Sequence, residues 1–276
     1  MKLRKVTAAS AVVLALAVSV TACGGDKKDD AAGGKKIKIG IKFDQPGLGL
    51  QKPDGSFAGF DVDVATYVAK QLGYQPNQIE WVQTKSADRE SALARGDVKF
   101  IAATYSITDE RKQKVDFAGP YLLAHQDLLV KKGSDITKGT DLNSKKLCSV
   151  TGSTSAQNVK KTIAPKADLR PLSGYSECVA GLQSGAVDAL TTDDSILAGF
   201  AAQDKYKGQF QLAGLKLSNE NYGIGVKKGD SATVDKINKA LEKMVADKSW
   251  DKAVKDNFGP ANYKNEPAPK IGDIVK

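Results

Sequence analysis

Histidine is almost absent from this 276-residue sequence, which contains only His125. A metal centre built on several histidines is therefore excluded, and a Ser/His or Cys/His pair would have a single candidate base. The sequence also has no match to a nucleophile elbow, a phosphate-binding glycine loop or a metal pair. These absences argue against an enzyme and favour a structural role for His125.

A long apolar run is missing as well. The apolar stretch at 12–20 is about half of the roughly 20 residues that a membrane-spanning helix needs. It follows the basic residues Lys2, Arg4 and Lys5. This arrangement is typical of a signal peptide, which we predict over residues 1–22.

The predicted signal ends in Val20-Thr21-Ala22-Cys23, the pattern of a bacterial lipoprotein signal. In that pattern the thiol of Cys23 takes the lipid, and the alternative is a chance cysteine after an ordinary signal. Beyond Cys23, the sequence up to residue 36 has no apolar residue larger than alanine. We therefore expect a flexible tether over residues 23–36, held at the membrane by the lipid.

Arginine-rich stripes and basic-aromatic alternation are also absent, although the formal net charge is +9. Removal of the signal peptide lowers this charge to +6, because three basic residues are lost. The remaining lysines are interleaved with acidic residues, so nucleic acid is not an expected partner. The charge either keeps the protein soluble at an anionic surface, which we favour, or attracts an acidic ligand.

Cysteine is scarce, with three in the chain. If Cys23 carries the lipid, Cys148 and Cys178 remain, and an even pair in an exported protein predicts a disulfide. Closing a loop of about 30 residues would add roughly 3–4 kcal/mol of stability in the chain-entropy model. Two free buried thiols are the alternative.

The segment from 37 to 265 holds about 230 residues, which suits two lobes of about 100 residues each. Apolar spacing predicts alternating strands and helices, the order of a parallel sheet. The predicted strands are 37–41, 98–103, 146–150 and 187–191, and the predicted helices are 60–72, 86–95, 155–163, 175–184 and 194–202. Gly96 and Gly185 end two similar helix-turn-strand units, so we expect two lobes of similar construction.

Two further segments, 128–133 and 225–229, end in Val-Lys-Lys-Gly and are predicted to be extended crossings between the lobes. Two such links would let one lobe rotate against the other. The expected boundaries are lobe 1 at 37–130, lobe 2 at 131–220, a return to lobe 1 at 221–265 and a C-terminal tail at 266–276. An amphipathic helix near 232–245 should cover the first lobe.

Five motifs occur in the order of a known family: Gly59-Phe60-Asp61-Val62-Asp63, Ser106-Ile107-Thr108-Asp109-Glu110-Arg111, Asp116-Phe117-Ala118-Gly119-Pro120-Tyr121, Thr151-Gly152-Ser153-Thr154-Ser155 and Thr191-Thr192-Asp193-Asp194. On these motifs, residues 37–260 resemble the polar-amino-acid solute-binding proteins of ABC importers. The chain is most similar to the lipid-anchored glutamate-binding proteins of actinobacteria. The resemblance implies an α/β, two-lobed, type II periplasmic-binding-protein-like fold. Each lobe would be a mostly parallel sheet flanked by helices, with a two-strand hinge and the ligand in the inter-lobe cleft.

The resemblance also implies how such a protein works. It would bind glutamate as a monomer on the outer face of the cell membrane and pass the ligand to ABC permease and ATPase subunits. It would need no cofactor and no metal. Aspartate or glutamine as ligand, a ligand-sensing lipoprotein, and a dehydratase-type enzyme on the same fold are the alternatives.

An amino acid in a cleft needs a cation for its carboxylate and a carboxylate for its ammonium. Arg111, in the first turn of a helix that Thr108 should cap, corresponds to the arginine that binds the α-carboxylate in the family. Asp193 corresponds to the partner of the α-ammonium. From the residues alone, an exposed arginine and a helix-capping aspartate are the alternatives. Asp194 is better explained as the first residue of a helix.

Small polar residues complete the expected contacts with the ligand backbone. Ser106 corresponds to a position that bonds the ligand through its hydroxyl, and Thr104 to one that offers a carbonyl. The amides of Ser153 and Thr154 lie at a helix N-terminus and can meet a carboxylate. An ordinary N-cap at this turn is the alternative, and both can be true.

Two more cations concern the ligand side chain. Arg89 falls where acidic-amino-acid binders of the family place an arginine for the distal carboxylate, and Lys42 aligns with a second cation there. A solvated helix-face arginine and a surface lysine are the alternatives. Asp61 and Asp63 should point apart at a helix start, so we expect them to stabilise the helix dipole and not to bind a metal.

Overall fold

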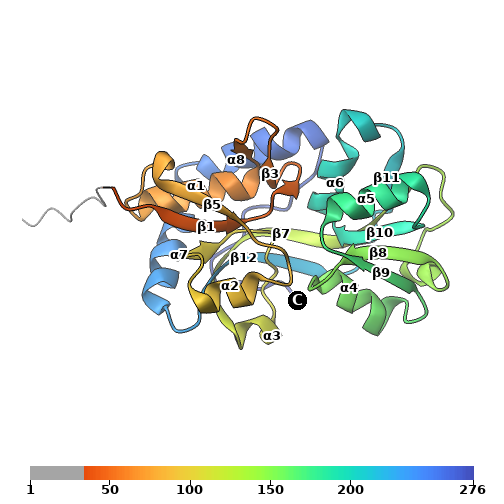
Figure 1. Ribbon diagram of the computed structural model, residues 1–276, viewed down its shortest axis with the longest axis horizontal. Helices are drawn as coiled ribbons and strands as arrows, with labels where there is room; N and C mark the ends of the chain where they lie inside the picture. Colours follow the sequence, from red (N-terminus) through yellow and green to blue (C-terminus); the bar gives the residue numbers. More distant parts are fainter. Residues whose placement is uncertain (1–33) are drawn as a thin grey trace, which may run out of the picture. The chain divides into compact units, whose positions relative to one another are not determined.

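The computed structural model describes residues 34–276, which build two lobes joined by the long strands β7 and β12 (Figure 1). The expected signal peptide, Cys23 and the tether up to residue 33 lie outside the described residues. Within residues 34–276, every helix is too short or too polar to span a lipid bilayer.

A nine-stranded sheet runs through both lobes in the order β5-β1-β6-β12-β7-β10-β8-β9, with β11 beside β7. Its strands are β1 (Ile37–Ile41), β5 (Ile79–Gln83), β6 (Phe100–Ile101), β7 (Val115–Lys131), β8 (Lys146–Val150), β9 (Asp168–Leu172), β10 (Ala189–Asp193), β11 (Phe210–Leu212) and β12 (Asn219–Lys227). In lobe 1, β1 pairs in parallel with β5 and β6, and in lobe 2, β8 pairs in parallel with β9 and β10. The hinge strands are antiparallel to their neighbours. Each lobe therefore holds the mostly parallel sheet that was expected.

Helices cover both faces of the sheet, because their apolar residues repeat at helical spacing. Lobe 1 carries α1 (Phe60–Gln71), α2 (Arg89–Arg95), α3 (Asp109–Lys112), α7 (Ser231–Ala246) and α8 (Ser249–Phe258). Lobe 2 carries α4 (Thr154–Asn158), α5 (Tyr175–Ser184) and α6 (Asp194–Ala201). The predicted return of an amphipathic helix to lobe 1 is confirmed by α7, which packs against α1 and β7.

The core beneath α1 is aromatic. The Phe60 ring lies 5.9 Å from Trp250, 5.0 Å from Phe258 and 6.1 Å from Tyr121 between ring centroids. These side chains are buried and join α1, β7 and α8 into one unit. Aromatic pairs at this separation add roughly 0.5–1.5 kcal/mol each beyond the area that they bury.

The helix ends predicted from glycine match the structure. Gly96 and Gly185 follow α2 and α5 with φ of 77° and 81°, the left-handed conformation that ends a helix without a Cβ clash. The two helix-turn-strand units are therefore equivalent, as predicted. The α2 helix begins at Arg89, three residues after its predicted start, because the Asp88 amide turns back to the Lys85 carbonyl.

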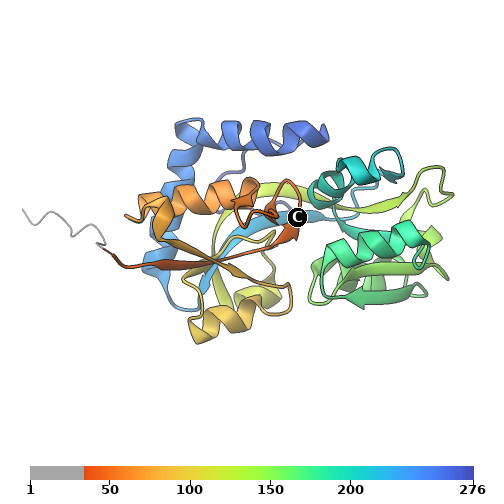
Figure 2. The ribbon, with the colours of Figure 1, turned by 45° about the horizontal axis from the view of Figure 1, so that its top comes forward.

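The predicted position of the crossings is wrong. β7 pairs with β12 up to His125 and with β10 from Gln126 onward, so it changes lobes before the segment at 128–133. Residues 225–227 of β12 already pair within lobe 1. The two Val-Lys-Lys-Gly motifs are the far ends of long hinge strands that run side by side (Figure 2). Strand composition does not show which neighbour a residue pairs with, and this is why the position could not be predicted.

The predicted C-terminal tail, residues 266–276, forms hydrogen bonds with the hinge strands. The Gly272 amide donates to the Gly119 carbonyl of β7 at 3.0 Å. Val275 donates to Asn221 Oδ1 at 3.0 Å, and Asn221 Nδ2 donates back to its carbonyl at 2.9 Å. The last residues of the chain therefore lie against one face of β12.

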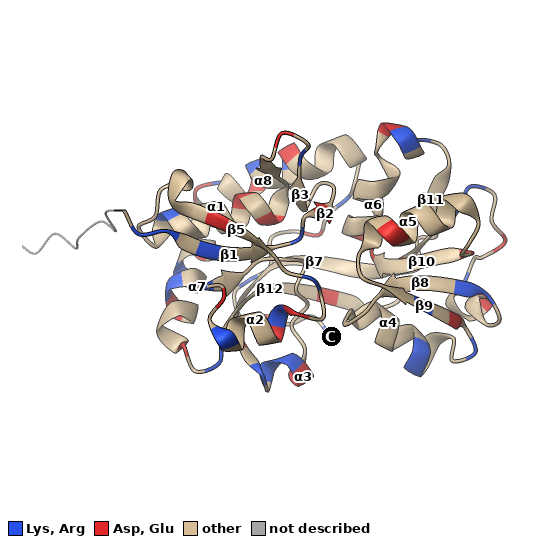
Figure 3. Cartoon of the chain, in the orientation of Figure 1, with Lys and Arg blue, Asp and Glu red and all other residues tan. Residues whose placement is uncertain are grey.

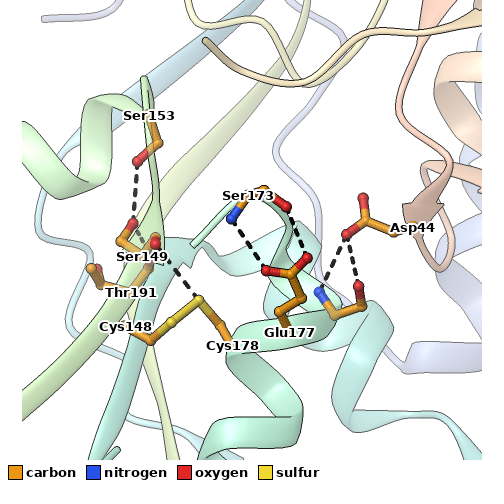
Figure 4. Close-up of a disulfide and its surroundings, with 9 residues drawn as sticks. Asp44, Cys148, Ser149, Ser153, Ser173, Glu177, Cys178 and Thr191 are labelled. Atoms are coloured by element: carbon orange, nitrogen blue, oxygen red, sulfur yellow. Dashed lines mark hydrogen bonds between the residues drawn. A yellow bond between two sulfur atoms is a disulfide. The ribbon is translucent and has the colours of Figure 1, made fainter. Parts of the chain in front are cut away.

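A disulfide joins Cys148 of β8 to Cys178 of α5, with Cα atoms 5.5 Å apart (Figure 4). It ties α5 to the sheet of lobe 2. Lysines and arginines alternate with acidic residues over the helices and loops of both lobes (Figure 3).

Candidate ligand-binding site

The residues predicted to bind a ligand lie where strands end and the two lobes face each other. Lobe 1 contributes Lys42 after β1, Arg89 at the start of α2, Thr104 and Ser106 after β6, and Arg111 in α3. Lobe 2 contributes Ser153 and Thr154 after β8 and Asp193 at the end of β10. All are buried except Thr154, which is half-buried. The alternative for Arg89, Lys42 and Arg111, that they are ordinary exposed surface residues, is therefore wrong.

Arg111 bridges the lobes. Its Nη1 donates to the Ser106 carbonyl at 2.8 Å, and its Nη2 donates to the Gly152 carbonyl of lobe 2 at 3.0 Å. Its Nε lies 3.5 Å from Glu90 Oε1. Thr108 caps α3 as predicted, accepting from the Arg111 amide at 3.2 Å. A guanidinium has more N–H donors than these contacts use, so capacity for a carboxylate remains.

Arg89 is the most deeply buried cation, with 2% exposure. Its Nη1 donates to the carbonyls of Ala103 and Thr104 at 3.0 and 3.2 Å, and its guanidinium stacks 4.0 Å from the Tyr105 ring centroid. Burial lowers the pKa of Arg89 to about 10, and the charge of Arg111 adds to the effect. Among the described residues Arg89 forms no ion pair with a carboxylate, so its buried positive charge has no counter-charge there.

Lys42 lies beside Arg89. Its Nζ donates to Ser86 Oγ at 2.8 Å, and 5% of the residue is exposed. Burial and then the charge of Arg89 hold the pKa of Lys42 well below its ordinary value. Among the described residues it too forms no ion pair with a carboxylate. Two neighbouring buried cations of this kind are stable when an anion lies between them.

Asp193 lies at the end of β10 in lobe 2, and Arg111 is the cation that acts on it. Tyr222 donates its hydroxyl to Oδ2 at 2.5 Å, and Ser155 donates its own to Oδ1 at 3.5 Å. Burial and then the charge of Glu220 raise the pKa of Asp193 well above its ordinary value. Its side chain makes no capping bond to α6, so a simple capping role is wrong. Asp194 begins that helix, as predicted.

Thr104 is held by a residue whose role the sequence did not reveal. Thr104 has a φ of 46°, which is uncommon for a residue with a side chain, and its amide donates to Asp61 Oδ2 at 2.9 Å. Tyr121 donates to Asp61 Oδ1 at 2.7 Å. Burial raises the pKa of Asp61 to about 6. Asp61 therefore does more than stabilise a helix dipole, because it fixes the turn that carries Thr104.

The turn before α4 serves partly as a cap. Ser153 Oγ accepts from the Ala156 amide at 3.1 Å, and the Ser153 amide donates to the Val150 carbonyl at 3.0 Å. The Ser153 amide is therefore engaged inside the turn, contrary to the role predicted for it. Thr154 donates its hydroxyl to Glu220 Oε2 at 3.0 Å.

The lobes touch around these residues. Asp44 of β2 (Asp44–Gln45) accepts from the Ser176 amide and hydroxyl of α5 at 3.3 and 3.1 Å (Figure 4). A Cβ on Gly152, whose φ is 79°, would lie 2.8 Å from the Ala87 backbone. A hollow of about 170 Å³ beside Lys42 and another of about 290 Å³ beside Arg111 flank the buried residues.

The described residues hold no group of three or more His, Cys, Asp or Glu side chains suited to a metal ion. The predicted site residues carry separated charge: Lys42, Arg89 and Arg111 are buried cations of lobe 1, with Glu90 beside Arg111, and Asp193 is a buried carboxylate of lobe 2. Two α/β lobes with a two-strand hinge and such a site define a ligand-binding protein of the type II periplasmic-binding class.

Comparison with known sequences identifies the family. Residues 37–260 match the bacterial extracellular solute-binding proteins, family 3, and the chain belongs to this family. It is 45% identical to the glutamate-binding protein GluB of Corynebacterium efficiens over 93% of this chain and 91% of that protein. It is 38% identical to the ABC transporter glutamine-binding protein GlnH of Bacillus subtilis over 92% of this chain and 97% of that protein. These relatives are binding proteins and not enzymes.

Solved structures agree with the fold. An ancestral arginine-binding protein bound to arginine superposes with a TM-score of 0.76 at 36% identity, covering 81% of this chain and 98% of that one. The sequence comparison and the structural comparison thus agree on a solute-binding protein with this fold.

Proposed function

We propose that this chain captures glutamate between its lobes and delivers it to an ABC importer. The observation that carries the proposal is the separation of buried charge. Arg89 and Lys42 have no carboxylate partner among the described residues, and Asp193 has no Lys or Arg partner there. Uncompensated buried charges are costly. A ligand with two carboxylates and one ammonium supplies all three missing partners.

The backbone of the ligand is assigned first. Arg111 binds the α-carboxylate, with the Thr154 amide at the helix N-terminus as a second donor. Asp193 pairs with the α-ammonium, and the Thr104 carbonyl and Ser106 hydroxyl complete its contacts. Among the described residues the Ser106 hydroxyl has no hydrogen-bond partner, so it can take this role.

The distal carboxylate is assigned to Arg89 and Lys42. The Arg89 guanidinium is held in place by two backbone carbonyls and the Tyr105 ring, which orients its remaining donors. Glutamine has nearly the same shape as glutamate but no charge there, and it would leave both cations unpaired. The 45% identity to a glutamate-binding protein supports glutamate as the ligand.

The chain acts at the outer face of the membrane in this proposal. Cys23 carries a lipid, residues 23–36 act as a tether, and the protein works as a monomer with permease and ATPase subunits. In the native host, wild type should label with palmitate and Cys23→Ser should not. Equal labelling of the two proteins would overturn the anchor.

Calorimetry of purified protein against glutamate, glutamine and aspartate tests the ligand. We expect glutamate to bind roughly a hundredfold more tightly than glutamine, from the cost of unpaired buried charge. Glutamine or aspartate binding as tightly as glutamate would overturn the assignment. No binding of any amino acid would overturn the proposed function as a whole.

A further inference from the structure

The two faces of the hinge strand β12 contact different parts of the protein. Side chains alternate along a strand, so Asn219 and Asn221 share one face while Glu220 and Tyr222 share the other. Asn219 and Asn221 bond to Lys276 and Val275 at the end of the chain. Tyr222 bonds to Asp193, so Glu220 lies on the face that looks into the candidate site.

Glu220 is a buried carboxylate without a cation. It is 5% exposed, and its oxygens accept hydroxyl bonds from Ser218 at 2.8 Å and from Thr154 at 3.0 Å. Among the described residues no Lys or Arg forms an ion pair with it. Two hydroxyl donors do not neutralise a buried negative charge, which still needs a proton or a cation.

Asp193 has the same deficit, and hydrogen bonds place it near Glu220. Tyr222, two residues from Glu220 on the same strand face, bonds to Asp193, and so does Ser155, whose neighbour Thr154 bonds to Glu220. After burial, the charge of Glu220 is the largest cause that raises the pKa of Asp193. The titratable or charged groups that face Asp193 are Glu220, Asp194, Arg111, Tyr175, Tyr222 and Tyr263. Arg111 is the cation in this set. Its charge affects the pKa of Asp193 less than the charge of Glu220 does, and its guanidinium is already bonded to Ser106 and Gly152. The pair is therefore predominantly negative and poorly compensated.

We propose that Glu220 supplies a second negative charge for the ammonium group of the bound amino acid, and that the carboxyl group of Asp193 carries a proton in the unliganded protein that leaves on binding. The O–H bond of the carboxylic acid breaks, the electron pair stays on the carboxylate, and the proton passes to the buffer. The ammonium then replaces the proton as the positive charge between the two groups. This inference rests on the proposed amino-acid site but does not require that glutamate be the ligand.

Glu220 also explains why Thr154 is oriented as it is. By accepting the Thr154 hydroxyl, Glu220 links the hinge to the turn that faces the α-carboxylate. A purely structural role would end with this bond. The proposed role adds a charge effect, which a bond to a neutral amide would not reproduce.

The test is calorimetry in two buffers of different ionisation enthalpy, phosphate and Tris, near neutral pH. For wild type, we expect the binding enthalpy to depend on the buffer, with between zero and one proton released per ligand. Glu220→Gln should abolish most of the release and weaken binding about tenfold, because one of two charges facing the ammonium is lost. Glu242→Gln, at an exposed position on α7, should match wild type in both respects.

Thermal unfolding without ligand separates the charge effect from a lost hydrogen bond. A raised pKa in the folded state means that stability falls as pH rises from the ordinary pKa of Asp193 through its folded value. Without the charge of Glu220, folding raises the pKa of Asp193 by less. The free energy of unfolding of Glu220→Gln should therefore increase relative to that of wild type as the pH rises between the ordinary and the folded pKa of Asp193. A structural hydrogen bond alone predicts a constant deficit.

The outcomes separate this inference from the proposed ligand. If glutamine binds best but protons are still released and Glu220→Gln stops the release, the glutamate assignment fails and the inference stands. If wild type binds with no buffer dependence and Glu220→Gln binds within threefold of it, the inference fails and the binding function stands. If no amino acid binds, both fail.

Discussion

Replacing Arg89 by glutamine tests the proposed recognition of the ligand side chain. Arg89 is 2% exposed, and in the proposed complex its guanidinium meets a carboxylate away from water. Removing one partner of a buried ion pair costs about 3–5 kcal/mol. Lys42 remains beside the same carboxylate, so the lower limit applies, which is roughly a hundredfold in affinity.

Glutamine should respond in the opposite direction. In wild type the side-chain amide of bound glutamine leaves the Arg89 charge without a counter-charge. In Arg89→Gln the same amide can hydrogen-bond to the amide of the substituted side chain. We therefore expect glutamine affinity to stay the same or improve. The roughly hundredfold preference for glutamate should narrow to less than about tenfold, or reverse.

The assay is calorimetric titration of wild type, Arg89→Gln and a control variant with both amino acids. Arg95→Gln is the matched control, because Arg95 lies on the same helix with its side chain 60% exposed and paired with Asp97. It should keep the wild-type preference. Thermal melts verify that each variant is folded. If Arg89→Gln keeps the wild-type ratio of glutamate affinity to glutamine affinity, Arg89 does not bind the γ-carboxylate.

Three further predictions follow from other contacts. Arg111→Ala and Asp193→Ala should each lose roughly a hundred- to several-thousand-fold in affinity for the amino acid, and binding within threefold of wild type would remove that residue from the site. Replacing Cys148 and Cys178 by alanine should lower the free energy of unfolding by about 3–4 kcal/mol in urea titrations, and an unchanged midpoint would contradict this. The pKa of Asp61 rises from 3.8 to about 6 on folding, so wild type loses up to about 3 kcal/mol as pH rises from about 4 to 6. Asp61→Asn should lack this loss, and parallel pH profiles for the two proteins would contradict it.

Much of the fold could be predicted because it follows from local rules. The α1 and α5 helices, their ends and the strand β1 depend on spacing and on glycine within a few residues. The roles expected of Arg111 and Asp193 came from the resemblance of their motifs to the family, and the residues alone added only that Asp193 follows a strand whose end can face the cleft. Non-local pairing could not be read in this way. β7 is 17 residues long and changes neighbours at Gln126, where its composition gives no signal.

The parts of the site that the sequence did not reveal depend on tertiary contacts. Asp61 reads as a helix-start residue, and only the fold brings it to the Thr104 amide. Tyr222 and Glu220 lie far along the chain from Asp193 and Thr154, and they meet because β12 crosses behind the cleft. Strand alternation from a known Tyr222 contact would have indicated Glu220, but no sequence signal indicates Tyr222 itself.

The most direct measurement of the central claim is a crystal structure of the protein grown with L-glutamate. The account predicts the γ-carboxylate within hydrogen-bond distance of Arg89 and Lys42, the α-carboxylate on Arg111, and the ammonium on Asp193. A glutamate bound outside the cleft, or one whose γ-carboxylate contacts neither Arg89 nor Lys42, would contradict it.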